Sequence, residues 1–315
     1  MDFSTLRVPV IAAPMFLISG PELVIAASRA GAIGAFPAPN CRTAEELDQW
    51  MSTIEAALTP TDGDPALPWA VNLVTHSTNE RLAADLEVVA AHRPPLVITA
   101  LGSPRPVMET VKGYGGLVLA DVISVALARK AAAAGVDGLA CVCAGAGGHT
   151  GHLSPFAFIS AVREFFDGTI AVGGGISDGY GVAGAVTAGA DLVYVGTRFL
   201  ATTESTAVAE YKQMVVEHGL DDLIVSSAVT GTDASWLRPS LVANGYDLDE
   251  LNAPVQRSYN SGNAAGHARW KDIWAAGQGL QTIHAVESAQ TVIDRLEVEY
   301  QKALTLAGAR RVIPL

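Results

Sequence analysis

The segment TIAVGGGISDGYGVAGAVTAGADLVYVGTRF, residues 169–199, contains the pattern on which the fold assignment depends. It begins with the apolar run Thr169–Gly173, passes through consecutive glycines, and continues as the helical stretch Gly179–Ala188. Gly189 then ends the helix, because glycine adopts the left-handed backbone conformation at low cost. A second apolar run, Leu192–Gly196, follows at once and leads into another glycine-containing turn. A strand, a helix and a strand connected in this way predict a parallel βαβ unit.

The same alternation extends through most of the chain. Runs that predict buried strands recur at Val8–Ala13, Ala32–Phe36, Trp69–Val74, Leu96–Ala100, Gly116–Ala120, Gly138–Cys143, Thr169–Gly173 and Leu192–Gly196. Helical stretches separate them, and Thr43 with Glu46 predicts a capping box at the start of one. Eight buried strands, each followed by a helix, predict a closed (β/α)8 TIM barrel of the α/β class. An open doubly wound sheet is the alternative, disfavoured because no Gly-x-Gly-x-x-Gly motif follows the first strand.

The alternation stops between residues 210 and 269. This stretch contains WLRPS at 236–240 and a polar segment from Asn252 to Asn263. We expect it to form a small, mainly helical domain, inserted as a lid over one face of the barrel. Residues 1–209 and 270–315 would then form the barrel itself, with Thr282–Leu306 as a long closing helix.

The composition favours an enzyme that acts on a small molecule. Half of the 315 residues are hydrophobic, 17% are charged, and the formal net charge is −12. An acidic chain without a Lys/Arg cluster is not expected to bind nucleic acid or an acidic membrane surface. The sequence has no evident signal peptide and no apolar run long enough to span a bilayer, so a cytoplasmic location is the simplest expectation. A homodimer is left open.

Two glycine-rich loops follow the seventh and eighth predicted strands. Gly174 and Gly175 lie in the first loop, and Gly196 and Thr197 lie in the second. The working site of a (β/α)8 barrel lies at the C-terminal ends of its strands, where the loops after strands 7 and 8 commonly hold a phosphate. Backbone N–H groups at the start of a helix supply the donors. The pair of loops therefore predicts a phosphorylated cofactor or substrate.

The loops after the first and third strands add two further candidates. Ala13, Pro14 and Met15 form an apolar turn that would suit a flat ring, although a plain strand-to-helix turn has the same pattern. Asn72 stands among apolar strand residues, and a buried amide needs hydrogen-bond partners. Either a bound heterocycle or a neighbouring backbone group would supply them.

His149 follows the sixth strand in the small-residue loop AGAGGHTGH, residues 144–152. Small residues let the backbone approach a ligand closely, and a neutral imidazole suits a general base. A solvent-facing loop histidine is the alternative. His149 and His152, together with Cys141 and Cys143, lack the usual zinc-ligand spacings, so no metal site is expected and the cysteines are assigned to the core.

Taken together, these residues resemble the nitronate monooxygenases, formerly called 2-nitropropane dioxygenases. The matching segments are Ala13–Met15, Val71–Leu73, Ala146–His149, Gly174–Ile176, Gly196–Phe199, Trp236–Ser240 and Ala276–Gly279. The resemblance implies a barrel that binds FMN without a covalent link, with a smaller domain over the site. It implies flavin contacts from Ala13, Pro14, Met15, Asn72, Gly148, Gly174, Gly175, Gly196, Thr197, Gln278 and Gly279. His149 matches the catalytic histidine of the family.

The resemblance also implies a reaction. An alkyl nitronate would be oxidised with O2 to a carbonyl compound and nitrite, and His149 would first remove the α-proton of a neutral nitroalkane. Val142 and Gly145 depart from the residues that many members carry beside the histidine loop, and this puts the substrate in question more than the cofactor. The alternative function is therefore a related flavin reductase or dehydrogenase that uses NAD(P)H and acts on a quinone, an enone or an acyl thioester.

An apolar pocket for a larger substrate would fit that alternative. Phe16, Phe156 and Trp236 are the candidate lining residues, and ordinary core packing is the competing interpretation of each. A third class is a barrel without flavin, such as an isomerase or an aldolase. No predicted strand ends in the lysine that a Schiff-base aldolase needs, which disfavours that class. The sequence assigns no role to His152.

Overall fold

Eight parallel strands close into a barrel in the computed structural model, which describes residues 3–60, 66–249, 251 and 272–309. The strands are β1 (Val10–Ala12), β2 (Ile33–Pro37), β3 (Trp69–Val74), β4 (Leu96–Ala100), β5 (Leu117–Val122), β6 (Gly138–Val142), β8 (Thr169–Gly173) and β9 (Leu192–Val195). They lie in chain order around the barrel, and β9 pairs with β1 to close it. The predicted (β/α)8 barrel is confirmed.

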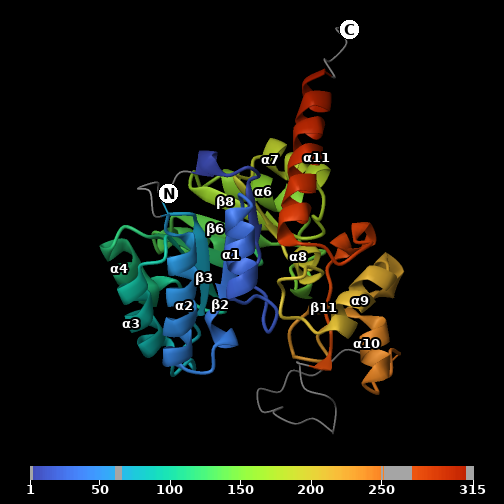
Figure 1. Cartoon of the computed structure of the whole chain (residues 1–315), viewed down its shortest axis with the longest axis horizontal. Helices are drawn as coiled ribbons and strands as arrows, with labels where there is room; N and C mark the ends of the chain where they lie inside the picture. The colour runs from blue at the N-terminus through green and yellow to red at the C-terminus, as the bar shows by residue number, and fades with distance from the viewer. Residues whose placement is uncertain (1–2, 61–65, 250, 252–271, 310–315) are drawn as a thin grey trace.

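Helices surround the strands, and the long helix α11 closes the ring beside α1 and α7 (Figure 1). The helices of the barrel are α1 (Pro21–Arg29), α2 (Ala44–Leu58), α3 (Leu82–His92), α4 (Arg105–Gly113), α5 (Val125–Ala133), α6 (Pro155–Arg163), α7 (Gly179–Thr187), α8 (Thr197–Leu200) and α11 (Ala289–Ala309), with short 3-10 turns η1 (Phe3–Thr5), η2 (Ala38–Asn40) and η6 (Gln278–Thr282). The predicted closing helix begins later than expected, at Ala289, because the chain first forms η6.

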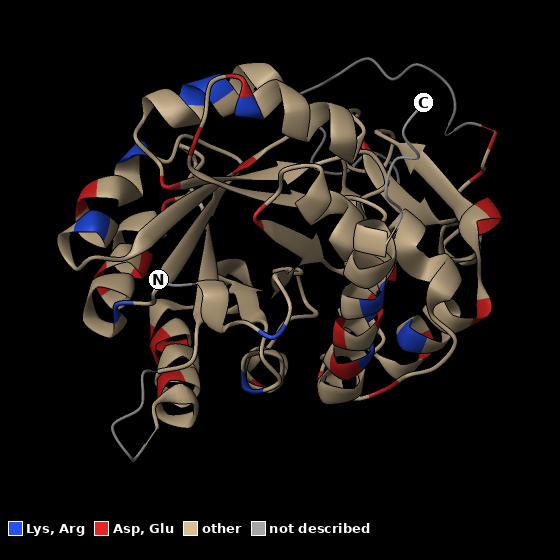
Figure 2. Cartoon of the chain, turned by 90° about the horizontal axis from the view of Figure 1, so that it is seen from above, with Lys and Arg blue, Asp and Glu red and all other residues tan. Residues whose placement is uncertain are grey.

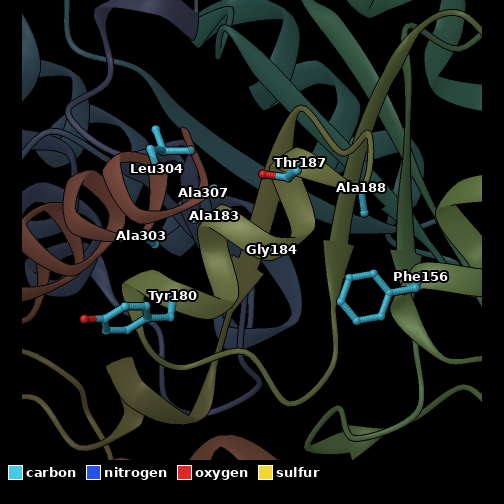
Figure 3. Close-up of a pocket in the computed structure, with 9 residues that line it drawn as sticks. All are labelled: Phe156, Tyr180, Ala183, Gly184, Thr187, Ala188, Ala303, Leu304 and Ala307. Carbon is cyan, nitrogen blue, oxygen red and sulfur yellow. The ribbon is translucent and has the colours of Figure 1, made fainter. Parts of the chain in front are cut away.

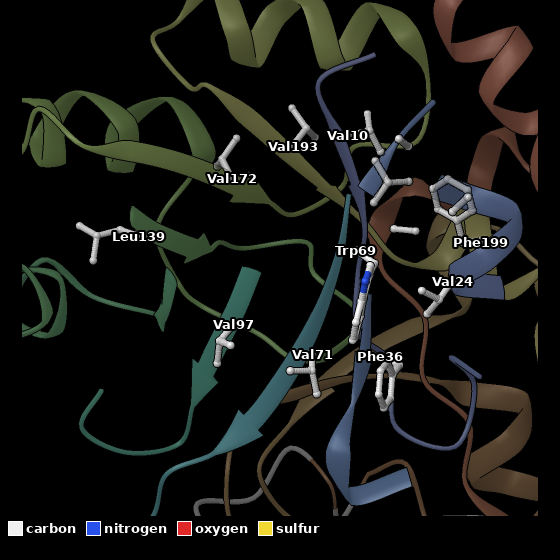
Figure 4. Close-up of a cluster of buried hydrophobic side chains, with 14 of the residues drawn as sticks. Val10, Val24, Phe36, Trp69, Val71, Val97, Leu139, Val172, Val193 and Phe199 are labelled. Atoms are coloured by element: carbon white, nitrogen blue, oxygen red, sulfur yellow. The ribbon is translucent and has the colours of Figure 1, made fainter. Parts of the chain in front are cut away.

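Strand side chains alternate between two apolar layers. Outward-facing residues such as Val71, Val97, Val172 and Val193 pack under the helices (Figure 4). Inward-facing residues fill the barrel and form a separate cluster, which consists of Ile11, Ile33, Ala35, Ala70, Leu96, Ile98, Leu119, Ala140, Ala171, Leu192 and Tyr194. Because side chains two apart on a strand share a face, this cluster identifies which strand-end residues face the barrel mouth.

Local signals in the sequence set the ends of the helices. The Thr43 hydroxyl accepts a hydrogen bond from the Glu46 N–H at 3.2 Å, as the predicted cap requires. In a capping box, the Glu46 carboxylate would accept a hydrogen bond from the N–H of Thr43. Here it accepts from the N–H of Arg42, one residue earlier.

The inserted region contains a sheet that the sequence did not predict. Strands β10 (Leu223–Ser226) and β11 (Ala234–Leu237) pair antiparallel, and β11 also pairs with β7 (Gly148–His149), which comes from the loop after β6. The helical elements of this region are α9 (Ala209–Glu217), η3 (Leu220–Asp222) and α10 (Arg238–Ala243). Helical residues therefore outnumber strand residues in the described part of the insertion, as expected, but the small sheet was not expected, and the polar segment from Asn252 to Asn263 lies outside the described residues.

Charged side chains lie mainly on the outer helices and connecting loops, with acidic groups in the majority (Figure 2). Over the residues that the structure describes, no helix is both long and apolar enough to cross a membrane. In the same part of the chain, no three His, Cys, Asp or Glu side chains gather as a metal site would require. The three cysteines are unpaired and buried.

Candidate active site

His149 lies on a short strand and not on a free loop. It is part of β7, where it stands opposite Ala234 of β11, and Gly148 stands opposite Ser235. The Thr150 N–H donates to the carbonyl of Asp233 at 3.1 Å, so the pairing continues past the histidine. The inserted region thus fixes the backbone that carries His149 above the barrel.

The His149 side chain is accessible at the barrel mouth, yet the surrounding protein removes enough water to lower the pKa of its imidazole from the ordinary value of 6.5. A lowered pKa keeps the ring neutral at pH 7. A neutral imidazole can accept a proton, which is the property required of a general base.

The glycines around His149 are required by close backbone packing. A Cβ on Gly147 would lie 2.6 Å from the backbone nitrogen of Gly277, and a Cβ on Gly151 would lie 2.2 Å from the carbonyl oxygen of Val142. Gly145 has φ +89°, which favours glycine in any case. The loop after β6 is therefore pressed against the segment that returns from the insertion.

The loop after β8 packs against the same loop. Gly174 and Gly175 have φ values of +147° and +70°, and a Cβ on Gly174 would lie 2.5 Å from the carbonyl oxygen of Ala144. The carbonyl of Gly145 accepts from the N–H of Gly175 at 3.0 Å and from the N–H of Gln278 at 2.8 Å. Three segments that are distant in sequence therefore meet at one carbonyl group.

The loop after β9 joins this arrangement through Thr197. Its hydroxyl accepts from the N–H of Gly277 at 2.9 Å. On the other side, a Cβ on Gly196 would lie 3.6 Å from the Sδ of Met15 and 3.8 Å from the Cβ of Ala13. The structure thus brings the predicted phosphate loops beside both the turn after β1 and the segment around residue 278.

One part of the phosphate prediction needs correction. The N-terminus of α7 is already occupied by carboxylates, because Asp178 accepts from the N–H of Gly181 at 2.7 Å and Glu299 accepts from the N–H of Gly179 at 2.9 Å. A second anion would be repelled there. An anion at this loop would instead meet the glycine turn ahead of the helix, around Gly174 and Gly175.

Polar side chains form the floor beneath these loops. Asn72 follows Ala70 on the inward face of β3, and its amide donates to the carbonyl of Ile98 at 3.3 Å. Across the barrel, the Tyr194 hydroxyl lies 3.4 Å from Oδ1 of Asp121. The buried Asn72 amide was expected to need hydrogen-bond partners, and the carbonyl of Ile98 is one of them.

Asp121 and Tyr194 were not among the predicted site residues. The signal that would have found them is the two-residue alternation on their strands, since Leu119 and Leu192 face inward and the residues two positions later must do so as well. Burial raises the pKa of the Asp121 carboxyl to about 7, while the hydrogen bond from Tyr194 acts in the opposite direction.

The predicted apolar pocket residues do not lie together. Phe16 is 44% exposed in the loop after β1, at the barrel mouth. Phe156 is 61% exposed on α6 and lines an outer groove with residues of α7 and α11, including Tyr180 and Leu304 (Figure 3). Trp236 is fully buried in the core of the small sheet, where its indole N–H donates to the carbonyl of Ser226. Phe156 thus lies in an outer groove, and Trp236 is a core residue of the small sheet, so the two do not line one pocket with Phe16.

His152 also has a structural partner. Its Nε2 lies 3.1 Å from the Asp233 carboxylate, at the start of β11. The pair is exposed, so its contribution to stability is small. The contact joins the end of the loop after β6, which carries His152, to the inserted region.

These loops leave room for a phosphorylated cofactor at two positions. An added Cβ would meet no atom within 4 Å at Gly148 and only ordinary contacts with Met15 and Ala13 at Gly196, whereas Gly174 packs against the carbonyl of Ala144. Gln278 is exposed beside the glycine turns, whereas Gly279 is buried, and a Cβ on it would lie 2.7 Å from the Cβ of Ser177. The fold and the loops at its mouth are those of a (β/α)8 barrel enzyme.

Comparison with known proteins agrees with this class. The chain matches the model of the family described as nitronate monooxygenase over residues 1–299, and it belongs to that family. Membership makes it a flavin-dependent oxidoreductase. A nitronate monooxygenase of Paraburkholderia phytofirmans is 26% identical, over 94% of this chain and 93% of the relative.

One further related sequence and one solved structure are similar to this chain. A Rhodococcus jostii protein named as a 5-hydroxy-7a-methyl-1-oxo-octahydro-1H-indene-4-carboxyl-CoA dehydrogenase is 29% identical, over 87% of this chain and 75% of that protein. The crystal structure of a nitroalkane oxidase from Streptomyces ansochromogenes superposes with a TM-score of 0.79 at 23% identity, over 96% of this chain and 99% of the other. The second likeness supports the fold.

Proposed function

We propose that this protein is an FMN-dependent nitronate monooxygenase, which oxidises alkyl nitronates with O2 to carbonyl compounds and nitrite. The observation that carries the proposal is the placement of a neutral histidine on a strand fixed above the mouth of a flavin-family barrel. The bound flavin would supply the redox chemistry by accepting electrons from the substrate.

The chain's own residues have separable roles in this proposal. With a neutral nitroalkane, the imidazole of His149 accepts the α-proton. The electron pair of the broken C–H bond stays on the substrate, which becomes the negatively charged nitronate. Gly174, Gly175, Gly196 and Thr197 hold the phosphate, while Ala13, Pro14, Met15, Asn72 and Gly148 contact the rest of the cofactor. Gln278 and Gly279 close the pocket from the returning segment.

A dehydrogenase or reductase that uses NAD(P)H is the second candidate. Apolar side chains at the mouth favour it, since Phe16, Leu101 and Ile123 are 44%, 59% and 40% exposed after β1, β4 and β5. Leu17 and Leu101 have φ values of +59° and +60°, a conformation that costs an ordinary residue about 1–3 kcal/mol and is common at functional sites. The similarity to a carboxyl-CoA dehydrogenase points the same way, towards a larger apolar substrate.

Anaerobic mixing distinguishes the two candidates. The flavin-loaded protein is mixed in turn with NADH, NADPH and propionate 3-nitronate, and the flavin absorbance is followed in a stopped-flow instrument. We expect the nitronate to reduce the flavin rapidly and both nicotinamides to leave it oxidised. Rapid bleaching by NADH or NADPH, without a response to the nitronate, would replace the monooxygenase by the dehydrogenase. A purified protein without flavin absorbance would overturn both candidates.

A further inference from the structure

Asp121 is a carboxyl group at the barrel mouth that the proposed chemistry does not use. It stands near the end of β5, two residues after Leu119, which belongs to the inward-facing cluster. Its Oδ1 lies 3.4 Å from the hydroxyl of Tyr194, another member of that cluster. Both observations place the carboxyl on the inner face of the barrel, at the end where the cofactor loops gather.

The contact between Asp121 and Tyr194 crosses the barrel. Their strands, β5 and β9, are separated by β6 and β8, where small residues stand at the inward positions Ala140, Ala171 and Gly173, and Val142 stands at the end of β6. A Cβ on Gly173 would lie 2.7 Å from the Cβ of Tyr194, so the tyrosine occupies the space that this glycine leaves. The small residues thus allow the phenol to reach the carboxyl.

No described Lys, Arg or His forms a salt bridge with this carboxyl. The titratable groups around it are Tyr194 on β9 and Cys141 on β6, and burial raises the pKa of both. On β4, Thr99 does not titrate; it shares the outward face of Val97 and donates to the carbonyl of Leu119. The histidines on loops at this end of the barrel include His149 after β6 and His76 after β3.

An ionised Asp121 is therefore a negative charge without a compensating cation among the described residues. Burial raises its pKa to about 7, so its proton is exchanged within the working pH range. A flavin that gains electrons gains negative charge, and a negative charge in the same site raises the proton affinity of a carboxylate. Reduction at the mouth should favour the protonated carboxyl.

We propose that Asp121, positioned by Tyr194, takes up a proton when the bound flavin is reduced. The electrons come from an external donor, the proton comes from solvent, and an O–H bond forms on the carboxylate while no bond of the protein breaks. This inference rests on the proposed flavin site but not on the identity of the substrate. Asp121 is thus a proton-holding residue, and Tyr194 is a positioning residue.

The test uses the flavin-loaded protein without substrate. The visible absorbance of the oxidised flavin is titrated from pH 5.5 to 8.5, and proton uptake on reduction with dithionite is measured with an indicator dye at pH 8. The wild type should show an absorbance transition near pH 7 and should take up more protons than Asp121→Asn, which should lack the transition. Tyr194→Phe should move the transition to higher pH, because the hydrogen bond that lowers the pKa of Asp121 is lost.

Asp167→Asn is the matched control, since Asp167 is an exposed carboxylate outside the strands and it should behave as the wild type. Thermal unfolding of each variant establishes that it is folded. An unchanged transition and unchanged proton uptake in Asp121→Asn would overturn the inference while leaving the proposed function intact. A folded wild type that holds no flavin would overturn the inference and the proposed function together.

Discussion

The two sides of the barrel mouth are built differently. On the side of β8 and β9, the contacts are made by backbone groups, and the carbonyl of Gly145 accepts N–H groups from Gly175 and Gln278. On the side of β6, the proposed base is the side chain of His149, and its backbone pairs with a strand contributed by the insertion. The first side requires glycines, because a side chain would collide with neighbouring backbone. The second side requires that the inserted region pairs correctly with the strand that carries His149.

This difference separates binding from turnover. Changes on the glycine side should remove the cofactor and with it every activity. Changes in the small sheet should leave the cofactor bound and lower the rate, because they move His149 without altering the phosphate loops. The predictions below use this separation.

The largest effect is expected from Gly174→Ala. Its φ of +147° is unfavourable for alanine, and the added Cβ would lie 2.5 Å from the carbonyl oxygen of Ala144. We expect a loss of about 2–4 kcal/mol in stability and of bound flavin. Chemical unfolding and the flavin-to-protein absorbance ratio measure the two effects.

Gly184→Ala is the control for this prediction. Gly184 lies in α7 of the same βαβ unit, and a Cβ there would meet no atom within 4 Å. Alanine in a helix should be neutral or stabilising by up to about 1 kcal/mol. If both glycine variants bind flavin equally well, the backbone account of the phosphate side is wrong.

A more selective effect, a loss of turnover without a loss of flavin, is expected from Trp236→Ala. Trp236 fills the core behind the sheet that holds β7, and removing a buried tryptophan costs about 3–5 kcal/mol of packing. We expect kcat to fall at least about tenfold while the flavin content stays within a factor of two. Val225→Ala, on the exposed face of β10 in the same sheet, should leave both quantities unchanged. Loss of flavin from Trp236→Ala would show that the two sides do not act independently.

The smallest expected effect concerns the pH dependence of kcat/KM. Burial lowers the pKa of His149, so the proton-accepting form is fully present above a midpoint that lies below pH 6.5. For a neutral nitroalkane, kcat/KM should rise with pH through this midpoint and then level off. The preformed nitronate should lack that rise, because no proton has to be removed. Matching profiles for the two substrates would argue against His149 as the base.

The sequence predicted the glycine side more completely than the histidine side. Gly174 and Gly175 could be recognised because a positive φ leaves a direct mark on residue type, whereas Gly196 and Thr197 were found from their place after the eighth strand. The eight-strand barrel followed from periodicity in the same way. Local information was sufficient in both cases.

The strand pairing that holds the backbone of His149 could not be predicted from local sequence. Strands β7 and β11 are separated by more than eighty residues, and a two-residue strand such as Gly148–His149 carries no periodic pattern. Asp121 was missed for a different reason, since the alternation on β5 that turns it inward was visible but was not used. Phe156 was misplaced because the sequence does not specify which face of α6 its side chain occupies.

The central claim is that His149 acts as a base over the flavin, and it is tested most directly by His149→Ala. The variant is loaded with flavin, and kcat/KM is measured for nitroethane and for its preformed nitronate. We predict a fall of about 10²–10⁴ with nitroethane and a change of less than about tenfold with the nitronate. Equal losses on both substrates would contradict the claim.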